Sequence, residues 1–267
     1  SKGEVLPPIL NDMHIDAMVG HWDFAYGPEQ LKKLASQLNY PLLGINVYNA
    51  DGTLFLQPYL VREIANIKTA IIGICSNIID KTMPKQFSEG LKITDGTEEL
   101  PVYIQKVKEE GADLIILLSH NGFPQDCELL SKIPGVDICL SAHTHNRLYE
   151  AVKIKNSIII QCGCHGSFIG HLDIELEKNK IAGYNYRLKT VDESFPVCSD
   201  TETKIKAAMA SYAPLQSEIV GHSPTMLHRY NILNSGMDNL LLSSLRWKTG
   251  SEVAFSNGWR YGIPIPA

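Results

Sequence analysis

Residues 113–146 read DLIILLSHNGFPQDCELLSKIPGVDICLSAHTHN, and this stretch decides the fold. Two apolar runs of strand length, at 113–119 and 136–142, enclose a segment that predicts a helix over 125–132. Runs that are apolar throughout are typical of strands buried on both faces of a sheet. The stretch therefore predicts a strand-helix-strand unit within a largely parallel sheet.

The same alternation continues through the first two thirds of the chain, so we expect the α/β fold class. Further helices are predicted over 98–110 and after Gly27-Pro28, where leucines recur at helical spacing. Other apolar runs predict strands, and these are 15–20, 40–48, 68–76 and 157–163. Residues 170–176 and 183–192 alternate apolar and polar side chains, which is typical of an antiparallel pair with one wet face.

The domain organisation follows from the later segments. We expect an α/β domain over 1–195, a linking helix within 196–215 and the start of a second domain over 216–267. Ser199–Glu202 and Ser235–Asp238 read as capping boxes for two helices, the first halted near Pro214 and the second closed by Gly250. Residues 252–262 predict strand and loop. The last segment is too short to bury a core of its own, so we expect a piece of a longer protein.

Charge and cysteine content exclude several classes of function. The chain has 24 Lys+Arg against 29 Asp+Glu, a net charge of -5, without the basic cluster that nucleic acid would require. No apolar run approaches the roughly 18 residues of a membrane span, so we expect neither nucleic acid nor membrane as a partner. Six cysteines in 267 residues are too few for a disulfide scaffold. Cys162 and Cys164, two apart, would face the same side of a strand.

Four of the nine histidines follow predicted strands directly, and they are His21, His120, His143 and His145. Residues beyond the carboxyl ends of parallel strands meet in one crevice of an open sheet. Neutral imidazole is the commonest protein ligand for Zn, Mn or Fe. A single histidine at a strand end is usually structural, but three strand ends and an HxH pair together predict a metal site.

The remaining ligands and the substrate contacts stay open from the residues alone. A two-metal hydrolytic site needs carboxylates that bridge and balance charge, whereas Asp23, Asp51 and Asp126 each read equally well as turn or solvated residues. His165, in the glycine-rich loop GCHGSFIG, is a candidate substrate contact. The glycines of that loop do not form a phosphate-binding fingerprint.

Four blocks carry a family resemblance: GHWDFAYG (20–27), LLSHNGF (117–123), SAHTHN (141–146) and NGWRYG (257–262). In this order they resemble the 5′-nucleotidase superfamily of calcineurin-like metallophosphoesterases, whose blocks read GNHEFDYG, a strand ending in SH, and GHTH. That superfamily has Asn-His where this chain has His21-Trp22. The GHW version, with LSHNGF and FSNGWRYG, resembles the SoxB thiosulfohydrolase family of bacterial sulfur oxidation.

The resemblance implies a metallophosphoesterase-like β-sandwich flanked by helices, followed by the start of a 5′-nucleotidase-type domain. It implies that His21, His120 and His143 bind one of two divalent ions, with manganese favoured over Zn or Fe, and that His145 binds the other. Family members begin with an Asp-x-His and a Gly-Asp block, which this chain lacks. We therefore expect truncation at both ends, weak binding of at most one metal, and no activity from this piece alone.

The resemblance also implies a reaction. The whole protein would hydrolyse the terminal sulfonate of a cysteine S-thiosulfonate on a SoxYZ-like sulfur-carrier protein, as a periplasmic monomer that releases sulfate. Trp22 and Arg260 would be the catalytic residues, with His165 and Arg260 contacting the sulfonate. A sulfur leaving group ionises near a pKa of about 8.5, so it needs less protonic help than the alkoxide expelled by a nucleotidase.

Two other functions remain open. One is a 5′-nucleotidase or related metallophosphoesterase, which hydrolysis of AMP far faster than of thiosulfonates would identify. The other is a metal-binding module without catalysis, which metal binding without hydrolysis of either substrate would identify.

Overall fold

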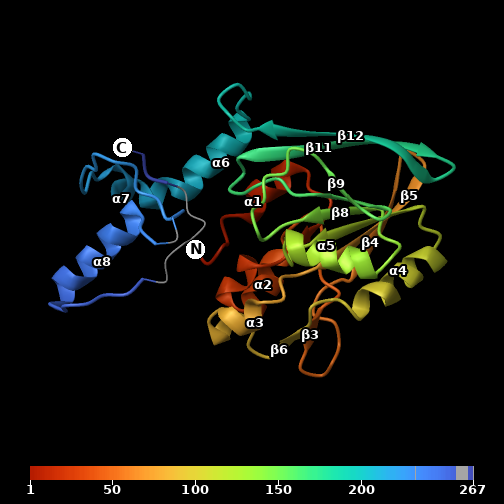
Figure 1. Ribbon diagram of the computed structural model, residues 1–267, viewed down its shortest axis with the longest axis horizontal. Helices are drawn as coiled ribbons and strands as arrows, with labels where there is room; N and C mark the ends of the chain where they lie inside the picture. The colour runs from red at the N-terminus through yellow and green to blue at the C-terminus, as the bar shows by residue number, and fades with distance from the viewer. Residues whose placement is uncertain (232, 257–263, 267) are drawn as a thin grey trace. The chain divides into compact units, whose positions relative to one another are not determined.

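A computed structural model describes residues 1–231, 233–256 and 264–266. The residues group into two compact units, Ser1–Ala208 and Met209–Ala267. The first unit holds the sheet of the α/β fold, as the sequence predicts, and Figure 1 shows helices packed around that sheet. Within the described ranges, no helix combines the length and the apolar character that crossing a membrane would require.

The central sheet has six strands in the order β4-β5-β7-β8-β10-β9. Its four inner strands are parallel, and an antiparallel strand closes each edge. In chain order the strands are β4 (Tyr59–Ile64), β5 (Ile67–Ile74), β7 (Leu114–Ser119), β8 (Ile138–Ser141), β9 (Val152–Ile154) and β10 (Ser157–Ile160).

Three two-stranded pairs complete the named strands among the described residues. A parallel pair joins β1 (Met18–Val19) to β2 (Leu42–Leu43), and an antiparallel pair joins β3 (Val47–Asn49) to β6 (Leu91–Ile93). The predicted antiparallel pair is a long hairpin, β11 (Phe168–Glu177) and β12 (Lys180–Thr190), which lies alongside the sheet in Figure 1. Gly170 lets this hairpin approach closely, because an added Cβ would lie 2.4 Å from Cys162 Sγ.

Helices α4 (Glu99–Glu109) and α5 (Phe123–Lys132) cover one face of the sheet (Figure 1). Their apolar residues, Leu100, Ile104 and Val107 among them, share a buried cluster with the inner strands. The shorter helices of this unit are α1 (Pro7–Leu10), α2 (Pro28–Ala35) and α3 (Ile79–Thr82). A second buried cluster lies around α2, α3, β2, β3 and β6. Apolar burial on this scale is the main driving force for folding.

The later helices depart from the predicted boundaries. Helix α6 (Ser199–Met209) begins at Ser199 itself, so this serine is not an N-cap and the first capping box does not form. The chain then makes a 3₁₀ turn, and Pro214 lies in the first turn of a new helix, α7 (Ala213–Ser217), where its missing N–H costs nothing. The expectation that Pro214 ends the linking helix is therefore wrong.

Helix α8 (Gly236–Thr249) forms where it was predicted, and Gly250 closes it in the left-handed conformation. Its N-cap Ser235 makes no side-chain capping bond. Instead its hydroxyl donates to Asp238 Oδ2 at 2.6 Å, because Arg229 and Ser256 hold that carboxylate from the other side. The second capping box is therefore also wrong. Residues 252–256 form no strand, and the rest of that predicted segment, to 262, lies outside the described residues.

Candidate metal centre

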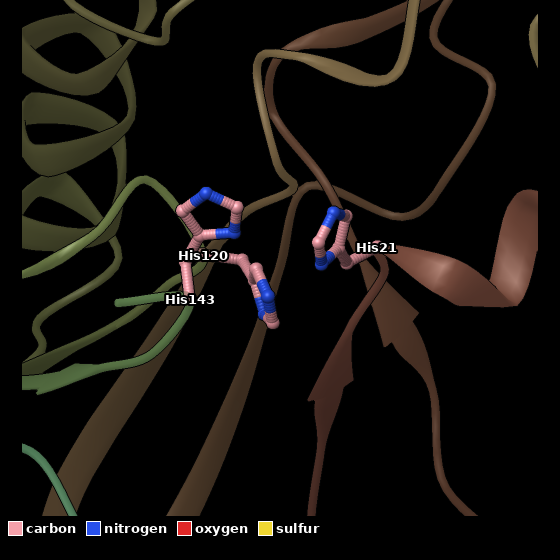
Figure 2. Close-up of side chains that lie close together, drawn as sticks. All are labelled: His21, His120 and His143. Carbon is pink, nitrogen blue, oxygen red and sulfur yellow. The ribbon is translucent and has the colours of Figure 1, made fainter. Parts of the chain in front are cut away.

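Three of the predicted histidines converge. His21, His120 and His143 each offer a ring nitrogen, and these nitrogens lie within 4.8 Å of one another. The ring centroids of His21 and His120 are 4.6 Å apart, and those of His21 and His143 are 4.8 Å apart. Figure 2 shows the three imidazoles turned toward one another. Side chains from three distant segments of the sequence thus form one cluster.

Strand ends place these imidazoles. His21 follows β1, His120 follows β7 directly, and His143 lies two residues beyond β8. Two backbone hydrogen bonds link the ends of neighbouring strands: the His120 N–H donates to the Ile74 carbonyl at 3.0 Å, and the Ser76 N–H donates to the Gly20 carbonyl at 3.1 Å. The carboxyl edge of the sheet therefore fixes the cluster, as expected for an open parallel sheet.

Burial keeps the cluster uncharged at neutral pH. Burial first, and neighbouring imidazoles second, lower the pKa of His21 to about 4 and that of His120 to about 3. Burial also lowers the pKa of His143. Neutral imidazole is the form that binds a metal, so no proton has to be removed at pH 7.

The hydrogen bonding also fits a metal ion. His21 Nε2 and His143 Nδ1 are buried and have no hydrogen-bond partner. A buried polar atom left in this state costs roughly 1–3 kcal/mol unless something satisfies it. Three neutral nitrogen donors facing one another suit a borderline divalent cation, which would satisfy those atoms.

A buried carboxylate, which the sequence left open between a metal ligand and a turn or solvated residue, holds two of the strand ends together. Asp126 of α5 is fully buried and accepts hydrogen bonds of 2.5 Å from the Ser119 and Ser141 hydroxyls. These serines are the last residues of β7 and β8, just before His120 and the His143 segment. Asp126 is therefore a positioning residue. The recurrence of serine at both strand ends was the signal that could have found it.

The HxH segment is fixed from β10. Gln161, buried just beyond β10, donates from Nε2 to the Ala142 carbonyl at 2.8 Å and accepts the Asn146 N–H. Thr144 Oγ1 accepts the Phe123 N–H at 3.0 Å, at the start of α5. The two bonded ends hold the segment between residues 142 and 146. Sequence reasoning did not identify Gln161 or Thr144.

His145 belongs to a different group from the other three. Its ring nitrogen, Cys164 Sγ and a ring nitrogen of His165 lie within 4.8 Å of one another. The His145 and His165 ring centroids are 5.7 Å apart. Strand β10 ends at Ile160, so the expectation that Cys162 and Cys164 share one side of a strand is wrong. Cys162 Sγ instead lies 3.8 Å from the Tyr186 hydroxyl.

The candidate carboxylates lie elsewhere. Asp23 accepts the His21 N–H at 3.0 Å, and Asp51 accepts the Thr53 N–H at 3.0 Å in an exposed turn. Asp126 is committed to its two serines. None of the three belongs to either ligand group that the described residues form. Both groups therefore lack the charge-balancing carboxylate of a two-metal site.

Of the two predicted catalytic residues, the structure describes only one. Trp22 opens a 3₁₀ helix (Trp22–Tyr26), is 64% exposed, and has its ring 5.6 Å from that of His21. It therefore borders the histidine cluster without being buried. Arg260 lies outside the described residues.

Comparison with known proteins finds relatives that share the fold. The solved structure titled sulfate thiohydrolase SoxB, from Thermus thermophilus, matches with a TM-score of 0.89 and 26% identity, over 94% of this chain and 46% of that one. A 5′-nucleotidase precursor from the same organism matches with a TM-score of 0.84 and 19% identity, over 93% and 54%. The venom 5′-nucleotidase of Naja atra is 24% identical over 94% of this chain and 54% of its own.

The chain thus spans about half the length of these relatives. No family model matches it. The central sheet with flanking helices is nevertheless shared along nearly the whole chain, and the relatives include metallophosphoesterases and 5′-nucleotidases. The similarity in sequence and in fold supports the superfamily that the sequence resemblance implies, that of 5′-nucleotidases and calcineurin-like metallophosphoesterases.

Proposed function

We propose that the whole protein is a thiosulfohydrolase, which releases sulfate from a cysteine S-thiosulfonate on a sulfur-carrier protein. The observation that carries the proposal is the place of His21. This histidine stands where the superfamily has asparagine, and its ring lies within the cluster with His120 and His143. The exposed Trp22 follows it where a nucleotidase has histidine. The likeness to the structure titled SoxB supports the same proposal.

In this proposal His21, His120 and His143 hold one divalent ion, with manganese favoured and Zn or Fe also suited to imidazole. The ion, when bound, makes water more acidic and offsets negative charge on the substrate. The chain's own contribution is to keep three imidazoles neutral and fixed at the sheet edge. Arg260 would hold the sulfonate oxygens, since guanidinium pairs with them through two parallel hydrogen bonds.

The reaction explains Trp22 chemically. Water oxygen bonds to the sulfonate sulfur and its protons pass to solvent. The sulfur–sulfur bond breaks, and its electron pair leaves with the sulfur that stays on the carrier, as an anion. Thiols ionise near a pKa of about 8.5, so such a leaving group requires little protonation. An indole N–H donates hydrogen bonds only, so at neutral pH it does not serve as a general acid or a general base. Trp22 beside His21 can therefore form an apolar wall for the site without acid-base chemistry.

The substrate would be a cysteine on a SoxYZ-like carrier, and the protein would act as a periplasmic monomer. Trp22 and His165 are both exposed, so a carrier's extended segment could reach them without a deep pocket.

A second candidate is hydrolysis of nucleotide phosphate esters. The relatives favour it, because the probable 5′-nucleotidase of Treponema pallidum is 31% identical over 54% of this chain. The sequence at Trp22 and Ala25 argues against it, since neither residue supplies the acid-base pair of that reaction.

The test uses the natural full-length protein loaded with manganese. Sulfate release from a carrier cysteine S-thiosulfonate is compared with phosphate release from AMP, in wild type, His21→Ala and His171→Ala. We expect sulfate release that His21→Ala abolishes. His171→Ala is the control and should have no effect, because His171 lies on the exposed hairpin beside Asp173 and Arg187. Faster phosphate than sulfate release would replace this proposal with the second candidate.

A further inference from the structure

Arg147 follows the HxH segment, and its backbone is fixed to the loop after β10. Arg147 and Cys162 pair as an antiparallel β-bridge. Backbone hydrogen bonds of 3.0 and 3.1 Å flank this bridge, one on either side. Arg147 therefore has a fixed place two residues beyond His145.

Two aromatic rings hold the Arg147 guanidinium. Its central carbon lies 5.0 Å from the centroid of the Phe168 ring and 5.4 Å from that of the Tyr149 ring. Both distances are within the roughly 6 Å over which an aromatic face attracts a cation. Gly163 makes room for the Phe168 ring, because φ there is +69° and an added Cβ would lie 2.7 Å from that ring. The neighbouring sequence therefore places this side chain.

The guanidinium has no anionic partner in the part of the chain that the structure describes. Arg62 and Arg187 each pair with an aspartate, whereas among the described residues no carboxylate pairs with Arg147 and no oxygen accepts a hydrogen bond from it. Residues 142–149 and 161–168 contain no other Lys, Arg, Asp or Glu. An exposed guanidinium in this state is ready to bind a planar carboxylate through two parallel hydrogen bonds.

The surroundings of Arg147 suit a protein partner. Burial raises the pKa of the Cys164 thiol, and the nearby Arg147 charge opposes that shift, so the guanidinium lies close to the loop that carries His165. Tyr149 is 65% exposed, and Arg147 and His165 are exposed as well. Arginine and tyrosine are enriched among the residues that contribute most to binding at protein–protein interfaces. These exposed side chains therefore form a surface on which an acidic peptide segment fits.

We propose that Arg147 binds the side-chain carboxylate of an Asp or Glu on the segment of the carrier protein that presents the modified cysteine. The inference rests on the proposed function, because it names the chemistry by which that carrier is recognised. In that proposal the sulfonate is held by Arg260 and by the ion of the three-histidine cluster. Arg147 instead follows His145, which lies outside that cluster. It is thus available for a second anionic group of the substrate, and it determines specificity rather than the chemical step.

The experiment measures the binding of short fluorescent peptides to the natural full-length protein by anisotropy. Each peptide is blocked at both ends and has serine in place of the modified cysteine, within a chain of Gly and Ser. One Glu is placed at successive positions, and the matched peptide has Gln at the same position. At one position or more we expect Glu to bind about three- to fivefold more tightly than Gln, as a partly exposed ion pair allows. Arg147→Gln should abolish this preference.

Two further variants make the test specific. Arg62→Gln is the control, because Arg62 lies on β4, at the other edge of the central sheet from β9, and pairs with Asp16. It should keep the preference for Glu. Arg147→Glu should reverse the preference and favour Lys over Gln at the same position, a gain of affinity that misfolding cannot produce.

Each result decides the inference. Glu peptides that bind no better than Gln peptides at any position, or a Glu preference that persists in Arg147→Gln, would overturn it. Sulfate release from the corresponding S-thiosulfonate peptides is measured separately. If Arg147→Gln slows this release equally from Glu and Gln peptides, the guanidinium contacts the sulfonate and the inference is wrong. The serine peptides bind without turnover, so absence of sulfate release in wild type would contradict the proposed function alone.

Discussion

At the scale of single residues, the histidine cluster combines burial with exact placement at strand ends. Three imidazoles held neutral by burial supply donors of one kind, and Trp22 borders them from the solvent side. The chemistry of the site then depends on what stands next to the ligands. Two residues give predictions: Trp22 tests which reaction the site favours, and Asp126 tests how the strand ends that carry the histidines are held.

Trp22→His alone should give little phosphate-ester hydrolysis, because position 25 is alanine and the new imidazole would lack its carboxylate partner. Trp22→His with Ala25→Asp should raise AMP hydrolysis by at least about 10²-fold and lower sulfate release, since general acid-base help is typically worth 10²–10⁴-fold. Steady-state assays on the full-length protein measure both rates.

Ala25 is partly buried and packs against the apolar cluster that contains Phe24, so an aspartate there could disturb the fold. Metal content and thermal unfolding must therefore be measured in the double variant. If the folded, metal-loaded double variant gains nothing on AMP, discrimination between the two reactions does not lie at positions 22 and 25. It would then have to lie around Arg260.

Asp126 gives a pH dependence. Burial raises the pKa of its carboxyl from 3.8 to about 6, although the Ser119 and Ser141 hydroxyls lower it. A raised folded pKa means that its contribution to stability is complete below about pH 4 and is lost as pH rises through 6. Asp126→Asn removes this loss of stability, because the amide does not ionise. The variant should therefore gain roughly 2–3 kcal/mol relative to wild type between pH 4 and pH 7.

Urea unfolding of wild type and Asp126→Asn across that pH range checks the prediction. The histidines contribute equally to both free energies of unfolding, so their contribution cancels in the difference. A free-energy difference that stays constant from pH 4 to pH 7 would contradict it.

At the scale of elements, the site depends on the junction between α5 and the HxH segment. Gly122, the N-cap of α5, has φ +105°, and a Cβ there would lie 2.8 Å from Thr144 Cγ2. Thr144 stands between His143 and His145 and accepts the Phe123 N–H. The glycine therefore lets the helix start approach the segment that carries both histidines.

Gly122→Ala should destabilise the fold by about 1–3 kcal/mol through backbone strain and should also weaken Mn²⁺ binding, because Thr144 must move. Gly52→Ala is the matched control, since Gly52 has φ +83° but no heavy atom within 4 Å of an added Cβ. Gly52→Ala should therefore lower stability through backbone strain and leave Mn²⁺ affinity unchanged. Thermal unfolding and Mn²⁺ titration distinguish the two, and equal metal affinity in both variants would count against this role of Gly122.

The sequence predicted the elements whose signal is local. The inner strands are continuous apolar runs, so β5, β7, β8 and β10 were found, and the histidines after them followed. The edge strand β4 was missed because its residues include Arg62 and Glu63, which face solvent where the sheet ends. The role of Asp126 could not be predicted, since a carboxylate on a helix is usually exposed and its two serine partners come from different strands.

At the scale of the whole molecule, the chain spans about half of the relatives it matches, and the histidine cluster lies entirely within Ser1–Ala208. The ends of β1, β7 and β8 bring together three neutral ligands, from residues 21, 120 and 143. Charge-balancing carboxylates do not come from Asp23, Asp51 or Asp126. Metal binding by the sheet edge is therefore the claim on which the proposed reaction depends.

The most direct test is an anomalous-scattering map from crystals of the full-length protein grown with Mn²⁺, collected near the manganese edge. The account predicts a peak bonded to ring nitrogens of His21, His120 and His143 together. A map that places manganese elsewhere, with these three imidazoles unbound in an enzyme that still releases sulfate, would contradict it.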